Sequence, residues 1–225
     1  MNFLQLCQRL RQESGVPGTG PNGTTGQTGF NLKLVDWITT AYQDVQSLYS
    51  TWKFLQSDFS FTLTSAKRNY TPTEAGLTDH AHWKTNAWGD FRTYLDVSDE
   101  QYLEYASWDD YRFVYLFGAT RSASGRPTIF TTKPNKSLDF YPIPDDAYNV
   151  NGEYFKAPDI FTTNSSEPIF PSQFHLIIIW RALMFYGAYD AADERYVHGQ
   201  NEYKKVLQKL KADQLPAMSY GAPLA

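Results

Sequence analysis

Residues 174–186 read FHLIIIWRALMFY, and this stretch decides how the rest of the chain is organised. A helix with that sequence is apolar on nearly every side, so it must lie in the middle of a folded unit. The stretch is too short to span a bilayer, and Arg181 interrupts it. Pro171 and Ser172 predict its start, by a proline followed by an N-capping hydroxyl. Gly187, followed by small alanines, would let the chain turn closely into the next segment.

The segment that follows predicts a second helix with one buried face. Its apolar residues recur every three or four positions, which is the helical period. They are Tyr196, Gly199, Tyr203, Val206 and Leu210. Acidic residues open the segment and lysines close it, which suits the helix dipole at both ends. We therefore expect a hairpin of two helices over residues 171–213.

The composition of the 225 residues limits the classes of protein to consider. A net charge of -4 argues against a chain whose main function is to bind nucleic acid. Cys7 is the single cysteine, so no internal disulfide can form, which fits a reducing cytosol. The first residues lack the charge and apolar run of a signal peptide, so we expect none. Aromatic residues make up 16% of the chain, which suits either an aromatic core or large contact surfaces.

The chain begins with a predicted short helix and a glycine-rich loop. Asn2 can cap the helix with Gln5 as its partner, and Gly15 can end it. The loop over residues 15–29 contains six glycines and almost nothing to bury. Loops of that length are usually functional or disordered. A phosphate-binding loop is not expected, because no Gly-Lys-Ser/Thr ending is present.

A third helix and several strands are predicted between the two ends. The helix has the most regular stripe in the chain, and we expect it to pack on the hairpin at 171–213. The stripe comprises Val35, Ile38, Tyr42, Val45, Tyr49 and Trp52. Alternating patterns predict strands at 59–63, 91–95, 102–105, 128–132, 137–141 and 148–156, the last three as an antiparallel meander. Ser107 caps a short predicted helix with Tyr111, Val114 and Tyr115 on one face.

These elements predict an α+β fold, with helices at both ends and strands in the middle. The N- and C-terminal thirds form a helical bundle, and a small antiparallel β-sheet is inserted between them. We expect residues 1–225 to be a single domain. In it, residues 1–55 and 171–213 are the bundle, 56–170 the mostly β insertion, and 214–225 a C-terminal tail.

Few side chains point to chemistry. The acid pairs Asp109-Asp110 and Asp145-Asp146 are explained by helix-cap and turn positions. His80 and His82 would face the same side of a strand, but two histidines without a third ligand are weak evidence for zinc. His175 is more consistent with a buried core histidine than with a base. We therefore predict no catalytic, cofactor-binding or metal-binding residues, no cofactor and no enzyme activity.

Several stretches, in order along the chain, resemble the adaptor proteins of tailed bacteriophages. No single stretch is a chemical motif, and the resemblance lies in the collinear series over essentially the whole chain. The stretches are MNFLQLCQRLRQE at 1–13, LVDW at 34–37, YLFG at 115–118, GRP at 125–127, KPNKSL at 133–138, VNGEY at 150–154, FH at 174–175 and WRALM at 180–184.

The resemblance implies a structural head-to-tail connector in the neck of the virion, made in the cytoplasm of the bacterial host. Copies of such adaptors, usually twelve, form a ring beneath the portal protein and carry the tail or nozzle protein below. Genomic DNA passes through the channel without specific binding, and no membrane is involved. The family has no catalytic residues to carry over.

We expect two segments to bind partners, because neither has much local reason to fold alone. One is the glycine-rich loop and the other is the C-terminal tail, and either would order on the portal or on neighbouring subunits. The residues are Gly15, Gly18, Gly20, Gly23, Gly26, Gly29, Leu215, Pro216, Met218 and Tyr220.

Two other functions remain open from the sequence. An aromatic-rich carbohydrate-binding or hydrolytic tail component would need exposed tryptophans along one sheet face and two carboxylates about 5–10 Å apart. A nucleic-acid-binding module would use Arg9, Arg11 and the lysines at 204–211, and its DNA binding would depend steeply on salt.

Overall fold

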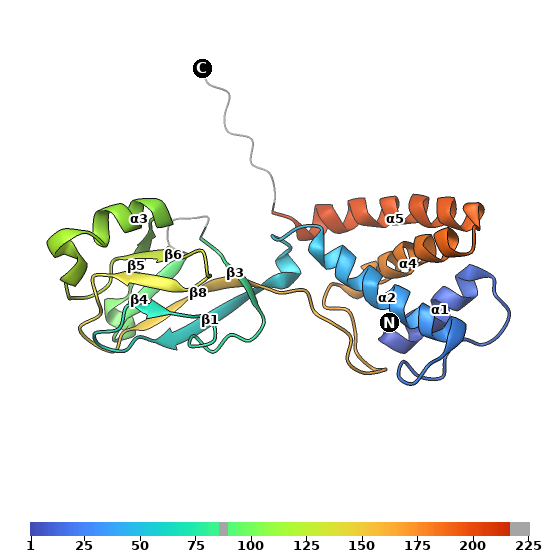
Figure 1. Cartoon of the computed structure of the whole chain (residues 1–225), viewed down its shortest axis with the longest axis horizontal. Coiled ribbons are helices and arrows are strands. Elements are labelled where there is room, and N and C mark those ends of the chain that lie inside the picture. The colour runs from blue at the N-terminus through green and yellow to red at the C-terminus, as the bar shows by residue number, and fades with distance from the viewer. Residues whose placement is uncertain (86–89, 217–225) are drawn as a thin grey trace, which may run out of the picture. The chain divides into compact units, whose positions relative to one another are not determined.

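The computed structural model of the protein describes residues 1–85 and 90–216. Within these ranges it has a mixed α+β fold of five α-helices and a curled, mostly antiparallel sheet of eight strands. The chain divides into two compact units (Figure 1). The helical unit contains Met1–Leu55 and the chain from Pro158 onward, and the sheet unit contains Gln56–Ala157.

The helical unit is built around the apolar stretch that follows Pro171. Its helices are α1 (Phe3–Ser14), α2 (Gly29–Ser47), α4 (Leu176–Tyr189) and α5 (Asp193–Gln214). The residues of α4 that are buried lie on several sides of the helix, because α1, α2 and α5 all pack against it. The predicted hairpin is confirmed, although Ser172 does not cap α4. It begins a 3-10 turn, Ser172–Phe174, that precedes the helix and has no side-chain cap.

Two glycines allow α4 and α5 to lie side by side. A Cβ atom on Gly187 would come within 2.7 Å of the backbone nitrogen of Tyr196. One on Gly199 would lie 3.0 Å from the carbonyl oxygen of Trp180. Any larger residue at Gly187 would therefore push against backbone atoms, which have little freedom to move aside.

The predicted caps of α1 are confirmed, and the predicted stripe of α5 is only partly buried. Asn2 and Gln5 form a reciprocal capping box, and Gly15 ends α1 in the left-handed conformation. On α5, Gly199 and Leu210 are buried, but Tyr196 is 36% exposed. The reason is that α5 packs mainly on α4, and a single neighbouring helix does not cover the whole apolar face of α5.

The segment after the sheet unit returns directly to the helices. Tyr42 on α2 stacks on Phe161, with ring centroids 4.1 Å apart, and its hydroxyl donates to Asp159 Oδ2 at 3.1 Å. The same hydroxyl accepts from the backbone of Ile169 at 3.0 Å. Residues 158–170, which the sequence pattern grouped with the β insertion, thus lie in the helical unit.

The sheet unit has its strands in the order β1-β8-β4-β5-β6-β7-β2, with β3 paired to β8. All the pairings are antiparallel except β5 with β6. The elements are β1 (Gln56–Thr62), β2 (Asn69–Tyr70), β3 (His80–Trp83), β4 (Phe91–Tyr94), β5 (Gln101–Tyr105), α3 (Trp108–Tyr115), β6 (Ile129–Thr132), β7 (Leu138–Tyr141) and β8 (Asn149–Lys156).

The meander predicted for the last three strands is wrong. β6 and β7 form the expected hairpin, but β8 pairs with β1, β3 and β4 instead of β7. The backbone of Ile143, just after β7, exchanges bonds with Ala123 and Gly125, which leads the chain away from β7. The outer side of β7 is then taken by β2.

An aromatic core fills the inside of the curled sheet. Phe91 stacks on Phe130 with centroids 4.3 Å apart, and Phe59 meets Phe91 and Trp83 edge to face. Gly152 on β8 makes room for these rings, because a Cβ atom there would lie 2.7 Å from Phe91. Many of the aromatic residues therefore lie in the core, which was the first of the two interpretations of the aromatic content.

Replacing Gly187 with alanine tests the close contact between α4 and α5. Alanine normally stabilises a helix relative to glycine, but here its methyl group would press on the backbone of Tyr196. We expect Gly187→Ala to lower the free energy of unfolding by about 2 kcal/mol, measured by urea denaturation. Ala188→Ser, at the exposed next position, is the control and should change stability little. An unchanged or higher stability of Gly187→Ala would contradict the packing.

Candidate functional site

The first half of the glycine-rich loop is folded back over α1. The Arg11 guanidinium donates to the carbonyl oxygens of Val16 and Pro17 and to Asn31 Oδ1, the last at 3.1 Å. Gln8 donates to the carbonyl of Pro21 at 3.1 Å. These polar contacts give the loop a reason to be ordered that its composition alone does not reveal.

The second half of the loop is less closely packed than the first half. Thr24 is held by Asn164, whose Oδ1 accepts from the threonine nitrogen at 2.8 Å and from its hydroxyl at 2.6 Å. Beyond it, a Cβ atom added to Gly26 or Gly29 would meet nothing within 4 Å. This end of the loop is therefore available for contact with another molecule.

The described residues of the two predicted partner-binding segments do not lie together. Gly15 lies beside the guanidinium of Arg195, in the first turn of α5, whereas Leu215 caps the far end of that helix. A rise of about 1.5 Å per residue separates these ends by about 30 Å. Pro216 is exposed, while Met218 and Tyr220 lie outside the described residues. Partner binding by either segment stays a prediction.

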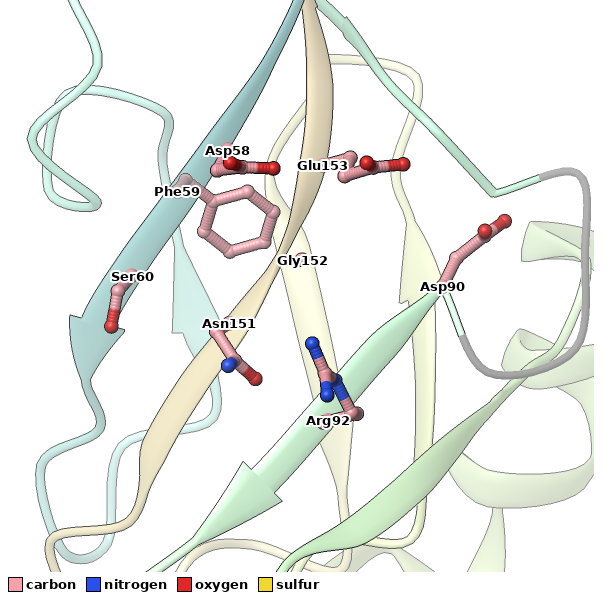
Figure 2. Close-up of a pocket in the computed structure, with 8 residues that line it drawn as sticks. All are labelled: Asp58, Phe59, Ser60, Asp90, Arg92, Asn151, Gly152 and Glu153. Carbon is pink, nitrogen blue, oxygen red and sulfur yellow. The ribbon is translucent and has the colours of Figure 1, made fainter. Parts of the chain in front are cut away.

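A polar hollow of about 720 Å³ opens on the sheet unit where β8 runs between β1 and β4 (Figure 2). Asp58 and Glu153 face each other across the β1–β8 pair, and Arg92 reaches in from β4. The remaining lining residues are Phe59, Ser60, Asp90, Asn151 and Gly152. Three of the side chains are carboxylates, so the hollow is the described feature closest to an acid–base site.

The charges of this hollow are largely engaged with neighbours. Glu153 forms an ion pair with Lys84, and Arg92 lies 3.4 Å from Glu100. Partial burial opposes ionisation of Glu153, but hydrogen bonds from Lys84 and Gln56 outweigh it and lower the pKa of the carboxyl. A general acid needs a raised pKa, so Glu153 is poorly suited to that role.

The tryptophans do not form an exposed row for a sugar to stack on. Trp52 and Trp83 are buried. Trp37, Trp108 and Trp180 are partly buried, so the ranges 1–85 and 90–216 contain no exposed tryptophan. Among the residues that the structure describes, the hollow in Figure 2 therefore lacks the stacking surface that the carbohydrate alternative requires.

His80 and His82 pack into the sheet in different ways. His80 lies against Trp83 and Tyr154, while His82 stacks on Phe155 with centroids 4.7 Å apart. The expectation that they face the same side is wrong, because a bulge shifts the β3 register between them. The described part of the chain contains no group of three or more histidine, cysteine or acidic residues arranged to hold a metal ion.

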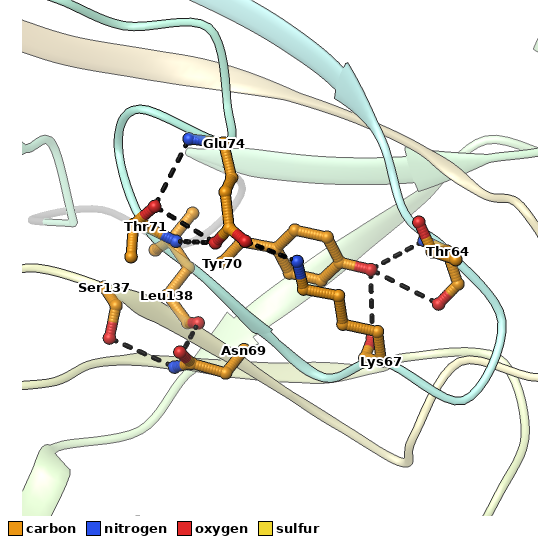
Figure 3. Close-up of polar contacts among 8 residues, drawn as sticks. All are labelled: Thr64, Lys67, Asn69, Tyr70, Thr71, Glu74, Ser137 and Leu138. Atoms are coloured by element: carbon orange, nitrogen blue, oxygen red, sulfur yellow. Dashed lines mark hydrogen bonds and ion pairs between the residues drawn. The ribbon is translucent and has the colours of Figure 1, made fainter.

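A compact polar turn connects β1 to β3 (Figure 3). The Tyr70 hydroxyl accepts from the backbone of Thr64 at 2.6 Å and donates to the carbonyl of Lys67 at 3.0 Å. Glu74 pairs with Lys67 at 2.6 Å and accepts from Thr71, and these bonds lower the pKa of Glu74 to about 2. These bonds stabilise the turn internally, and the Asn69 side chain connects it to β7 by donating to the carbonyl oxygen of Leu138.

Asp139 on β7 is a fully buried carboxylate held by three partners. Its Oδ1 accepts from the Tyr111 hydroxyl at 3.0 Å and lies 3.1 Å from Arg68, and its Oδ2 lies 2.5 Å from Lys133. Burial, followed by the nearby Asp139 charge, raises the pKa of Tyr111 above its ordinary value. The cluster is a structural joint: it connects α3, the β6–β7 hairpin and the residue before β2.

Four of the six basic side chains of the nucleic-acid alternative have partners within the helical unit. Arg9 pairs with Glu13 at 2.6 Å, and Arg11 is used by the glycine-rich loop. Lys205 pairs with Glu202, and Lys211 lies over the Tyr49 ring. This arrangement does not form an unpaired basic track for a phosphate backbone.

The most exposed apolar side chains of the described residues lie on and just after α3, and they were not predicted. Phe113 is 85% exposed and Phe117 80%, with Val114 between them at 51%. The predicted inner face of α3 is correct for Tyr111 but wrong for Val114. A signal was present, because Phe113 lies two residues after Tyr111, which places it on the opposite side of a helix, and Phe117 follows the end of α3. Monomeric soluble proteins rarely display such side chains together unless a partner covers them.

A family model described as SU10 adaptor protein matches residues 1–224 of the chain, which is nearly its full length. No curated protein matches the sequence. Among the residues described, none of the helices is both long enough and apolar enough to cross a membrane.

Replacing Asp139 with asparagine should destabilise the sheet unit strongly. The substitution leaves Arg68 and Lys133 beside a neutral group in a largely buried place, so we expect a loss of about 3 kcal/mol in unfolding free energy. Asp58→Asn is the matched control at an exposed strand position and should stay within about 0.5 kcal/mol of the parent protein. Urea denaturation measures both, and equal effects would contradict the structural joint.

The stability of the sheet unit should fall on acidification because of His80. Burial, then repulsion from Lys136, lowers the pKa of His80 from its ordinary 6.5 to about 4. The folded state therefore binds fewer protons than the unfolded chain, and the His80 contribution is lost as pH falls from 6.5 towards 4. His80→Phe should flatten the pH dependence of the melting temperature in that window. A His80 imidazole that titrates near 6.5 by NMR would contradict this prediction.

Proposed function

Because this chain belongs to the SU10 adaptor protein family, we propose that it is a structural connector between the head and the tail of a tailed bacteriophage. In this proposal, copies of the chain form a ring, usually of twelve, beneath the portal protein. A tail or nozzle protein attaches below, in the neck of the virion. The ring is built from chains made in the cytoplasm of the bacterial host. The observation that carries the proposal is the family match over residues 1–224.

The distribution of charge supports the passage of DNA through such a ring. Residues 56–157 contain 14 acidic and 10 basic residues, whereas the rest of the chain has 10 of each. The net charge of -4 thus belongs to the sheet unit. A wall that is neutral or acidic lets a polyanion pass, whereas a basic wall would hold it through its phosphates.

A structural function also agrees with the side chains of the described residues. Cys7 is buried, which raises the pKa of its thiol to about 12, so it stays a poor nucleophile. In the polar hollow, Glu153 pairs with Lys84 and Arg92 pairs with Glu100, and none of the lining residues that the structure describes is a tryptophan. We propose that the protein acts through its surfaces and needs no cofactor, while the helical unit serves as a rigid bundle.

The two partner-binding segments fit opposite ends of one rigid support. The glycine-rich loop lies near the start of α5, and the C-terminal tail follows the end of that helix, about 30 Å away. One segment can then contact the portal while the other contacts a neighbouring subunit or the tail. We propose that the C-terminal tail is the segment that contacts the portal.

Deleting Leu215–Ala225 tests the assignment to the portal. The full chain should be captured by purified portal rings of the same phage, and the deletion should weaken capture roughly tenfold or more, since the tail's contacts are lost. Capture is measured by co-sedimentation and by electron microscopy of the complex. Capture of the truncated chain at parental strength would exclude the tail. If neither chain bound portal rings, the connector function itself would be contradicted.

A matched variant separates the tail from the loop. Gly26→Ser with Gly29→Ser changes the open end of the loop at positions where an added Cβ meets no neighbour. Both positions have positive φ, so a small stability loss is expected, and melting temperature is recorded in parallel. This variant should still be captured by portal rings.

A further inference from the structure

The helical unit has a shallow groove beside the end of its last helix, which we call the α4–α5 groove. It has a volume of about 740 Å³ and lies between the start of α4 and the last turns of α5. Its apolar lining residues are Phe174, Leu176, Val206 and Ala212, and its charged ones are Lys209 and Asp213. Helices α1, α2 and α5 pack on α4, yet the first residue of α4, Leu176, is 38% exposed. Among the described residues, the groove is therefore a place where the apolar helix α4 is not fully covered.

The charges of the α4–α5 groove balance each other. Lys209 and Asp213 are four residues apart, so they lie on the same face of α5, next to Val206. The residues that line the groove thus carry no net charge. An uncharged apolar segment suits this surface better than a charged one, because it gains from the apolar walls without opposing either charge.

The chain leaves α5 at the edge of this groove. Asp213 lines the groove, α5 ends at Gln214, and Leu215 is in the extended conformation. Pro216 cannot continue the helix and favours the extended form of the residue before it. Residues 217–225 therefore begin only four positions after a residue of the groove.

The segment that follows has the composition that the groove requires. Residues 217–225, which lie outside the described part of the structure, read AMSYGAPLA and contain no charged side chain. Met218 and Tyr220 are two positions apart, so in an extended chain their side chains share one side. Nine residues at about 3.3 Å each reach about 30 Å, whereas Val206 and Asp213 are about 10 Å apart along α5. The segment is thus long enough to turn back and cover the groove.

We propose that the α4–α5 groove holds residues 217–225 of the same chain while the protein is free. Attachment to α5 decides between this occupant and the same segment of a second copy. A segment joined by a short link has an effective concentration of about 1 mM, far above the micromolar concentration of separate chains. A weak contact, such as a shallow groove provides, then suffices to keep the segment in place.

The contact gives the groove a regulatory role, and this part of the inference rests on the proposed connector function. In that function the portal binds the same tail as the groove, so residues 217–225 have to leave the groove before capture. A segment that is docked about nine-tenths of the time weakens capture about tenfold relative to a chain whose groove cannot hold it. The groove thus sets how readily a free chain joins the portal.

Limited proteolysis with chymotrypsin measures whether the segment is docked. Cleavage after Tyr220, followed by mass spectrometry, requires the undocked segment, so its rate follows the undocked fraction. Leu176→Asp places a charge in the groove wall at an exposed position, and we expect it to speed this cleavage about tenfold. Val197→Asp is the matched control, because Val197 is 52% exposed on α5 and does not line the groove, so cleavage should keep the parental rate.

Equal cleavage rates in the parent chain and in Leu176→Asp would overturn the proposal. Ala212→Arg keeps the test valid if Leu176→Asp fails to fold. Ala212 is an exposed groove residue in the last turn of α5, where a basic side chain suits the helix dipole. Its long side chain would occupy the groove, so Ala212→Arg should also speed cleavage after Tyr220.

Cross-linking identifies the chain that supplies the segment. Lys209→Cys with Ser219→Cys is treated with a short bifunctional maleimide at micromolar protein, and we expect a cross-link within one chain, which keeps the mass of a monomer. Cys7 does not compete, because burial raises the pKa of its thiol to about 12. Lys204→Cys with Ser219→Cys is the control and should cross-link much less, because Lys204 is exposed on α5 but does not line the groove. A cross-linked dimer, or equal yields from the two pairs, overturns the proposal.

Portal capture separates this inference from the connector function. Leu176→Asp should be captured by portal rings about tenfold more tightly than the parent chain, and capture at or below parental strength contradicts the regulatory role. If portal rings captured the parent chain but the cross-link to the groove did not form, the inference would fail and the connector function would stand. If the cross-link formed but portal rings captured neither chain, the connector function would fail and the contact would stand.

Discussion

The burial of α4 is the constraint on which the helical unit depends. A helix that is apolar on nearly every side cannot lie on the surface, so it needs neighbours around most of its circumference. The chain supplies α1 and α2 before the sheet unit and α5 after it. Residues far apart in sequence are thus drawn to one core, and the sheet unit becomes an insertion between Leu55 and Pro158. Tyr42, which contacts Asp159, Phe161 and Ile169, fixes the place where the chain returns.

The sheet unit solves a different problem, because it has to bury many rings inside a curled sheet. Large rings leave gaps or clash unless a position without a side chain makes room for them. Gly152 on the long strand β8 makes that room. The buried Asp139 then connects α3 to the sheet. A buried ion cluster adds little stability over an apolar one, but it fixes a unique arrangement when every partner is present. Here it fixes the direction in which α3 faces.

The sequence predicted those features that depend on neighbours along the chain. The capping box of Asn2 and Gln5, the end of α1 at Gly15 and the β6–β7 hairpin follow from local spacing and are present. The place of β8 could not be predicted, because its partners β1 and β4 are distant in sequence. Likewise, the order of the glycine-rich loop depends on Arg11 and Asn164, and the loop's own residues do not reveal it.

The same limit applies to the surfaces that matter for function. Val114 was predicted to share the inner face of α3 with Tyr111, and only the burial of Tyr111 shows which side of α3 faces inward. An adaptor has to combine a stable interior with apolar groups left uncovered, and the two requirements conflict unless the uncovered groups are held on a fixed support. Asp139 provides that support for α3, and α4 provides it for the helical unit. The buried polar joint and the buried apolar helix therefore serve function indirectly, because they decide which surfaces stay exposed.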